Sequence, residues 1–346
     1  MKKKTEVLYS IQSLRGIAAS MVVLYHSSSK LPDDSVLSSV RTIGNAGVDI
    51  FFVISGFVIY LTTQRSFSPA DAHHFLLRRI IRIVPAYWFY TTIAVAAALC
   101  APQLFGSYVF DLGHAIASFM FIPFPRTDGT VFPVLYLGWS LNFEMLFYII
   151  FAILMLYVPR SWVTFSLMCI FTILNFVVLF AKIDDSIFIF GNTLVFEFVA
   201  GCFVAKLWTE NKTMLATNIA WFGFILSFGV LLGTELFDVV EKRAFKWGLP
   251  SAFIVYFALS LEEHLGRFGK VMGFAGDISY SLYLTHLFTV PACLALLPIV
   301  GLDAYSSSVS AVICLYAASI IVAAAAYKLV EEPVTRFLRR RVRGRT

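Results

Sequence analysis

Charged residues are scarce in this sequence, and their scarcity excludes a water-soluble domain. Only 14% of the 346 residues are Asp, Glu, Lys or Arg, against about 25% in soluble domains. Apolar side chains take their place, because 59% of the chain is hydrophobic and its mean hydropathy is +0.81. The chain is therefore predicted to be an all-α protein that crosses a membrane several times.

Cysteine pairs and metal-binding spacings are also missing. The five cysteines all lie in apolar runs, without CxxC or Cys/His spacing. They are interpreted as small buried side chains, and no bound metal is expected. The first apolar run lacks a small-residue cleavage site, so it is predicted to be a permanent helix and not a signal peptide. The cysteines are Cys100, Cys169, Cys202, Cys293 and Cys314.

Ten apolar runs suggest membrane spans. A further short apolar stretch, residues 113–124, ends in a proline-rich segment and is predicted to be a re-entrant or interfacial helix. We expect a single transmembrane domain over residues 1–346, with a basic cytoplasmic tail over residues 330–346. The predicted spans are residues 11–29, 46–64, 83–101, 138–157, 162–181, 187–207, 213–233, 247–262, 272–297 and 308–329.

The distribution of positive charge predicts the orientation of these spans. If the N-terminus is cytoplasmic, nineteen of the 27 Lys and Arg residues fall in cytoplasmic segments, as the positive-inside rule requires. Both termini are therefore expected in the cytoplasm. One outer loop, TELFDVVEKRAFKW, runs against this trend with three cations. The basic tail and the net charge of +6 indicate contact with anionic membrane lipid, with a contribution to nucleotide binding as the alternative, and no nucleic-acid partner.

The first span carries two polar residues on one face. In LRGIAASMVVLYH, Arg15 and His26 are eleven residues apart, which returns a helix to within about 20° and separates them by roughly 16 Å. Ionisable groups inside a bilayer are costly and usually face a functional cavity. The second span, GNAGVDIFFVISGF, places Asp49 at the depth of His26. Asp49 is therefore predicted either to orient His26 for general-base catalysis or to stabilise the start of its own helix.

A cluster of arginines precedes the third span, in RRIIRIVPAYW. Arg78 and Arg82 share one helix face, with Arg79 between them, and arginine binds phosphate through paired hydrogen bonds. Ordinary arginines at a membrane surface are the alternative. Together with Arg15 and His26, they suggest the passage of a long phosphorylated carrier such as the pantetheine arm of coenzyme A.

Other acidic and polar residues within spans give weaker signals. Glu144, in LGWSLNFEMLFY, is an intramembrane carboxylate that needs a polar partner or a catalytic role. His286 is interpreted equally well as structural or as part of a site, and Glu197 as a partner of a neighbouring helix. The EEP run at 331–333 is expected to end the last span.

Taken together, these stretches resemble the acyltransferase-3 family of integral membrane O-acyltransferases. The motifs are LRGIAASMVVLYH, GNAGVDIFFVISGF, RRIIRIVPAYW, WSLNFEMLFY, ISYSLYLTH and the final EEP, in order over nearly the whole chain. The opening motifs are most similar to the branch that O-acetylates bacterial exopolysaccharides, the succinoglycan-type enzymes. A transporter or flippase for a lipid-linked or acidic solute is the alternative that ten apolar helices alone would fit.

The resemblance implies an enzyme of the bacterial inner membrane that moves acetyl from cytoplasmic acetyl-CoA to a hydroxyl of a surface glycan. By this resemblance His26 is the essential histidine, Asp49 the acid of the second span, and Arg15 the paired arginine. Glu144 occupies only one position of the family's commoner Glu-Glu pair, because Phe143 stands at the other. The implied catalytic residues are His26, Asp49 and Glu144, and the implied acetyl-CoA-binding residues are Arg15, Arg78, Arg79 and Arg82.

Overall fold

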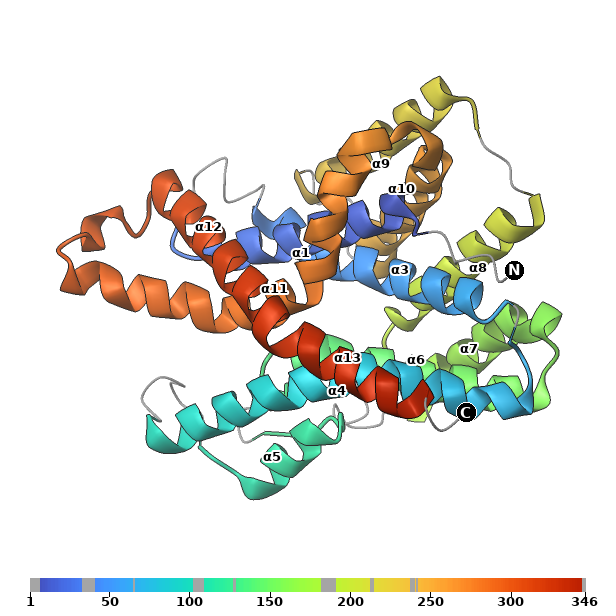
Figure 1. Ribbon diagram of the computed structural model, residues 1–346, viewed down its shortest axis with the longest axis horizontal. Helices are drawn as coiled ribbons and strands as arrows, with labels where there is room; N and C mark the ends of the chain where they lie inside the picture. The colour runs from blue at the N-terminus through green and yellow to red at the C-terminus, as the bar shows by residue number, and fades with distance from the viewer. Residues whose placement is uncertain are drawn as a thin grey trace. The chain divides into compact units, whose positions relative to one another are not determined.

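Helices account for the regular structure of the chain. The computed structural model describes residues 7–32, 41–64, 66–101, 109–126, 129–181, 191–211, 215–236, 240 and 242–343, and within these ranges no strand occurs (Figure 1). The all-α prediction is confirmed for this part of the chain. The helices group into two compact units, Met1–Leu61 with Glu197–Tyr327 and Thr62–Phe196 with Lys328–Thr346, and each unit is described by itself.

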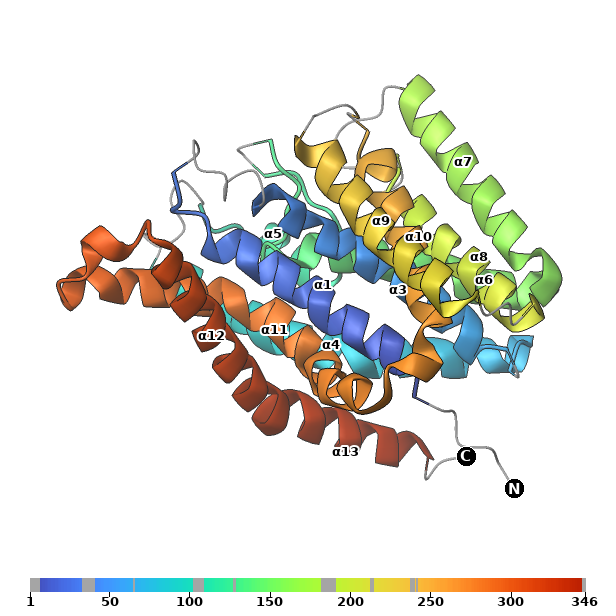
Figure 2. The same ribbon diagram turned by 90° about the horizontal axis from the view of Figure 1, so that it is seen from above.

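The first unit is built around the pairing of its first helix with α11. Helix α1 packs along α11, α11 packs on α12, and α9 packs on α10; Figure 2 shows α1 lying beside α11. The short turn η1 (Ile43–Asn45) leads into α3 and contacts α1. The helices of this unit are α1 (Tyr9–Ser27), α3 (Ala46–Thr62), α8 (Val195–Asn211), α9 (Thr217–Leu236), α10 (Leu249–Ser260), α11 (Gly266–Ile299) and α12 (Val309–Ala326).

The second unit is built around the long helix α4. Helix α4 packs against α6, α5 and α13, and α6 packs against α7. The arginine cluster predicted from the sequence, Arg78, Arg79 and Arg82, lies within α4, the same continuous helix that contains the predicted third span. The helices of this unit are α4 (Pro69–Cys100), α5 (Leu112–Phe119), α6 (Gly138–Tyr157), α7 (Val163–Ala181) and α13 (Glu332–Arg343).

The predicted spans correspond to helices throughout the described residues. Seven helical segments are long and apolar enough to cross a membrane. The other three predicted spans also form helices: polar residues lower the hydropathy of α1, whereas α8 and the segment Ala244–Ser260 are shorter. The protein is a multi-pass membrane protein, and the count of ten spans and the cytoplasmic termini stay predictions. The predicted short helix at 113–124 forms as α5, which Asp111 caps through the amide of His114.

The EEP run was expected to end the last span; the chain stays helical through this run, and where the span itself ends stays a prediction. The chain passes from α12 through a π-helical turn, Tyr327–Glu331, directly into α13. Pro333 is the second residue of α13 and follows directly on this π-helical turn. The predicted basic tail is therefore helical as far as Arg343.

The interpretation of the cysteines as buried side chains holds for one of the five. Cys202 is buried and its thiol donates to the carbonyl of Gly56, at 3.4 Å. Cys100 and Cys314 are exposed on helix surfaces, and Cys169 and Cys293 are half-buried. An exposed face on such a helix contacts lipid, so apolar sequence surroundings did not imply burial within the protein.

Small residues allow α1 and α11 to approach closely. A Cβ added at Gly16 would lie 2.7 Å from the Cβ of Ala275, and one added at Gly276 would overlap the carbonyl of Gln12. Glycine is therefore required on both helices, as is common where helices cross within membranes. Contacts follow the same chain direction on both helices, from Tyr9 beside Gly269 to His26 beside His286. The two helices therefore run parallel, as expected for the first and ninth spans of one topology.

Glu262 caps the N-terminus of α1. Its carboxylate accepts hydrogen bonds from the amides of Tyr9 and Ser10, both at 2.7 Å, and from the Ser10 hydroxyl. The N-cap residue Leu8 has no side chain that could serve these amides. A carboxylate at this position satisfies free N–H groups and interacts favourably with the helix dipole.

Loss of this cap is expected to loosen α1. Glu262→Ala removes the acceptor for three hydrogen bonds, so we expect the free energy of unfolding to fall by about 2 kcal/mol. Denaturant titration of the purified protein in detergent measures this change. The exposed neighbour Glu263 provides the matched control Glu263→Ala, which should change stability by less than about 0.5 kcal/mol. Equal stability of both variants would contradict the assignment of the cap.

Candidate active site

His26 lies in the last turn of α1 and faces α11. The residue is half-buried, and its ring centroid is 5.0 Å from that of His286, with the planes at 42°. The ring of Tyr25 meets it edge-on, also at 5.0 Å. His26 is the one basic residue in the last turn of α1, the end of the helix where the dipole is negative.

His286 is completely buried on α11 and presents one free nitrogen. Its Nδ1 lies 3.0 Å from the carbonyl oxygen of Leu282, one turn earlier. A carbonyl can only accept, so Nδ1 carries the hydrogen and Nε2 carries a lone pair. This Nε2 is buried and has no hydrogen-bond partner among the described residues. The sequence left the role of His286 open, and the structure places its ring against that of His26.

Asp49 does not meet His26 as the sequence predicted. It is completely buried on α3, and its two carboxylate oxygens accept from Nε and Nη2 of Arg243 at 3.1 and 2.8 Å. Arg243 also donates to the carbonyl of Asn45 at 3.4 Å and lies over the ring of Trp247, 4.7 Å from its centroid. The guanidinium fork satisfies both oxygens of Asp49, which is a better match than a single imidazole N–H could provide.

Glu197 lies beside this ion pair. It is buried in the first turn of α8, close enough to interact electrostatically with both Asp49 and Arg243. Burial alone would lower the pKa of the Arg243 guanidinium, but Asp49 and Glu197 outweigh burial and raise that pKa above its ordinary value. Glu197 is therefore within electrostatic range of this pair, and neither of its oxygens has a hydrogen-bond partner among the described residues.

The cation-rich loop before α10 now has a structural explanation. Arg243 pairs with Asp49, and Lys246 pairs with Glu235 at 3.1 Å. Sequence reasoning treated these cations as an exception to the positive-inside rule and missed Arg243 as a partner for a buried acid. The sequence did contain a usable signal. Three cations in a loop that the positive-inside rule predicts to be outside indicate that some of them pair with acids.

Arg15 belongs to a polar chain that links α1 to α11. Its Nη1 donates to the side-chain oxygen of Gln12 at 2.7 Å, and Gln12 donates to Asp277 of α11 at 2.9 Å. Arg15 is half-buried. Arg15 and His26 therefore mark the two ends of the polar stripe predicted along α1.

In the second unit, Arg79 and not the predicted pair carries the best-defined contacts. Its guanidinium lies 5.7 Å from the ring centroid of Phe75 and 5.9 Å from that of Tyr148, and Nη2 donates to the hydroxyl of Thr62 at 3.0 Å. The Tyr148 hydroxyl donates to Glu144, whose charge also reaches Arg79. Glu144 therefore has the polar partner that its burial requires, one helical turn away on α6.

Arg78 is more accessible than Arg79. Arg78 is exposed, whereas Arg82 is half-buried. Sequence reasoning missed Tyr148, although its i, i+4 spacing from Glu144 was a usable signal. The predicted site is divided between the units: His26, Asp49 and Arg15 belong to the first, and the arginine cluster and Glu144 belong to the second.

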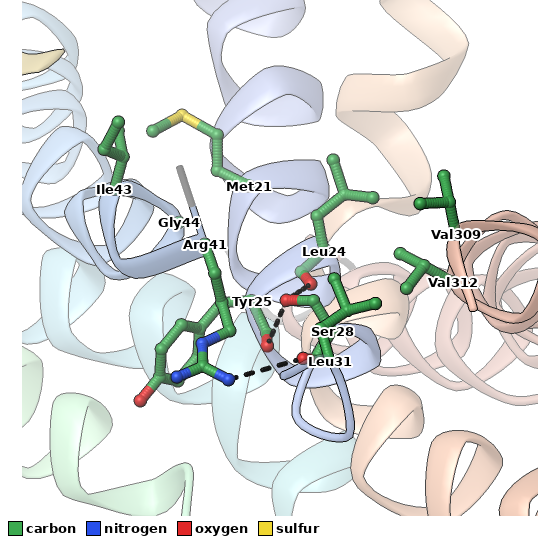
Figure 3. Close-up of a pocket in the computed structure, with 10 residues that line it drawn as sticks. All are labelled: Met21, Leu24, Tyr25, Ser28, Leu31, Arg41, Ile43, Gly44, Val309 and Val312. Atoms are coloured by element: carbon green, nitrogen blue, oxygen red, sulfur yellow. Dashed lines mark hydrogen bonds between the residues drawn. The ribbon is translucent and has the colours of Figure 1, made fainter. Parts of the chain in front are cut away.

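A pocket of about 250 Å³ is lined by residues of α1, η1 and α12 (Figure 3). Figure 3 shows Arg41 reaching the carbonyl of Ser28, at 3.5 Å, across a lining that is otherwise mostly apolar. Such a lining suits an apolar group better than a sugar. Its lining residues are Met21, Leu24, Tyr25, Ser28, Leu31, Arg41, Ile43, Gly44, Val309 and Val312.

The described part of the chain contains no group of three His, Cys, Asp or Glu side chains placed to hold a metal ion. An imidazole with one free nitrogen can take a proton from a hydroxyl, and arginines can hold phosphate groups.

Comparison with known proteins identifies the class of enzyme. Residues 8–328 match the family model described as an acyltransferase domain, and the chain belongs to the acyltransferase-3 family. It is an acyltransferase embedded in a membrane, so the alternative of a transporter is set aside.

Curated relatives carry related names. The exopolysaccharide production protein ExoZ of Rhizobium meliloti (strain 1021) is 36% identical over 303 residues, covering 85% of this chain and 90% of ExoZ. The peptidoglycan O-acetyltransferase OatA of Listeria monocytogenes (strain EGD-e) is 26% identical, over 94% of this chain and 55% of OatA. The O-acetyltransferase OatA of Staphylococcus aureus (strain NCTC 8325) is 24% identical, over 82% of this chain and 52% of its own length. No solved structure matches the chain.

Proposed function

We propose that this acyltransferase transfers an acetyl group from cytoplasmic acetyl-CoA to a hydroxyl of a bacterial exopolysaccharide or another surface glycan, within the inner membrane. The observation that carries this proposal is a half-buried imidazole, His26, at the C-terminal end of a helix inside a membrane acyltransferase. The names of the relatives support acetyl as the group and a glycan as the acceptor.

In the proposed reaction, His26 acts as general base. Its free ring nitrogen takes the proton of the acceptor hydroxyl while the oxygen attacks the thioester carbonyl carbon. A C–O bond forms, the C–S bond breaks, and the proton passes from His26 to the departing thiolate. Transient transfer of the acetyl group to His26 itself is the second route by which the same residues would act.

The arginines are proposed to hold the donor. Arg15 lies along the stripe that leads to His26, and Arg78, Arg79 and Arg82 would bind the phosphate groups of coenzyme A. The stacked and hydrogen-bonded position of Arg79 suits it to fix the geometry of α4 against α6. The exposed Arg78 is free to reach a ligand, and Arg82 lies one helical turn further along the same helix.

The direct test combines purified protein with its natural acceptor. Protein in lipid nanodiscs is supplied with acetyl-CoA and the surface glycan extracted from a strain that lacks the gene. We expect release of free coenzyme A and a gain of one acetyl group per modified sugar by mass spectrometry. If folded protein forms neither product, the proposed function is contradicted.

Loss of a phosphate-binding arginine is expected to weaken donor binding. Arg78→Ala or Arg82→Ala should raise the KM for acetyl-CoA by about tenfold, with kcat changed less than about twofold, because such contacts exist in both ground and transition states. Arg336→Ala is the control: Arg336 is an exposed arginine paired with Glu332 on α13. An unchanged KM in both α4 variants would show that these arginines bind something else.

A further inference from the structure

His286 has no part in the mechanism proposed above, yet its ring lies against that of His26. It is completely buried on α11, and its Nδ1 hydrogen bond to the Leu282 carbonyl directs a lone pair from Nε2. Within the described residues nothing donates to this Nε2. A buried acceptor without a donor costs stability, and such groups in native structures call for an explanation.

We propose that His286 is the positioning residue of the acyl transfer. Its Nε2 accepts a hydrogen bond from one ring nitrogen of His26, and this contact holds the other nitrogen of His26 toward the acceptor hydroxyl. The inference rests on the proposed function, because it supplies a partner to the proposed general base.

The geometry places the two imidazole rings next to each other. The two ring centroids are 5.0 Å apart and the planes are inclined at 42°. In the proposed contact, the ring of His26 turns about its Cβ–Cγ bond so that one of its nitrogens faces Nε2. His286 itself is held by Leu282 and by close packing, whereas His26 is half-buried and has room to turn. Catalytic hydrogen bonds are often long before substrate binds and shorten in the loaded enzyme.

The chemistry gives the contact a clear role at each stage. Before reaction, His26 donates its one N–H to His286, so its second nitrogen is fixed as the base. When the acceptor proton arrives there, His26 becomes an imidazolium, and the same N–H becomes a stronger donor to His286. When that proton leaves for the departing sulfur, both rings return to their starting states. No proton needs to move between the two rings.

A neutral orienting group suits this position. A carboxylate would have to be buried as a charge beside His26, whereas an imidazole is buried uncharged. The sequence suggested Asp49 for this role, but both oxygens of Asp49 accept hydrogen bonds from Arg243. His286 therefore takes over the function that a carboxylate performs in other hydrolytic and transfer enzymes.

Two substitutions separate positioning from packing. His286→Leu fills the space but offers no acceptor, and we expect kcat to fall by about 10- to 100-fold, with the KM for acetyl-CoA within about twofold of the wild type. His286→Gln restores an acceptor oxygen on a side chain of similar reach, and we expect it to recover most of the lost kcat. Thermal unfolding in the same detergent shows whether each variant is folded.

A second measurement is independent of turnover. In protein labelled with ¹⁵N-histidine, the side-chain signals of His26, identified by their loss in His26→Ala, should report one tautomer in the wild type and a mixture in His286→Leu. Wild-type kcat in folded His286→Leu, or the same two-tautomer spectrum with and without His286, would overturn the inference. If wild-type protein transfers no acetyl group, the proposed function fails, and the spectra alone still decide whether His286 orients His26.

Discussion

Replacing His26 with alanine is expected to abolish acetyl transfer while leaving the protein folded in the membrane. A positioned general base contributes about 10²- to 10⁴-fold to a reaction rate, and among the described residues the buried His286 is the one other imidazole whose ring contacts His26. We therefore expect kcat to fall by at least about 10³-fold. Release of coenzyme A and acetylation of the glycan should be lost together.

The design of this experiment separates chemistry from folding. His26 is half-buried, so its truncation removes little packing, and the thermal unfolding curve should shift only slightly. His264 is an exposed histidine in the turn between α10 and α11, and its ring contacts Thr217 of α9. His264→Ala is therefore the matched control. Imidazole added to the buffer can be tested for partial recovery in His26→Ala. Normal acetylation by His26→Ala would remove the central claim of the mechanism.

Breaking the Asp49–Arg243 pair is expected to have the largest effect on stability. Arg243→Gln leaves the completely buried Asp49 without its partner and next to the buried Glu197. Removing one member of a buried ion pair costs about 3–5 kcal/mol, because the remaining charge has neither water nor a counter-ion. Denaturant titration in detergent should show this loss.

The two members of the pair are not equivalent. The side chain of Arg243 is 31% exposed, so in Asp49→Asn its charge can still be hydrated and the loss should be smaller. The double variant Asp49→Asn with Arg243→Gln should be more stable than Arg243→Gln alone, since it leaves no buried charge from this pair. The exposed pair Arg336–Glu332 is the control, and Arg336→Ala should change stability by less than about 1 kcal/mol.

The same variants decide between two roles for Asp49. If Asp49 orients His26, as the sequence predicted, Asp49→Asn should keep full stability and lose activity. If its role is the pair with Arg243, stability falls first and residual activity follows the folded fraction. Full stability with no activity would favour the sequence prediction over the observed contact.

The helices were predictable from the sequence because a lipid environment imposes a simple pattern. Each apolar run of sufficient length must be helical to satisfy its own backbone, and the ten runs correspond to helices in the described residues. The helical continuation beyond α12 was not predictable, since proline usually breaks a helix and Pro333 here follows directly on a π-helical turn.

The candidate site was predictable in its members but not in its pairings. Residues such as His26 and Asp49 stand out because ionisable groups inside a membrane are costly. Which of them meet depends on how helices distant in sequence pack, and nothing local signals that α11 brings His286 to His26. From the positions of Asp49 and His26 in their spans, the sequence predicted that both lie at the same depth in the membrane. It did not indicate that Arg243 would bind Asp49.

The parallel crossing of α1 and α11 at Gly16 and Gly276 has a consequence for the evolution of this enzyme. His26 and His286 each stand ten residues beyond their glycine, about 15 Å further along helices that share one direction. The distance between the two imidazoles is therefore set by the packing of α1 against α11 and not by any loop. Surrounding loops can change in sequence while the two imidazoles keep their mutual distance.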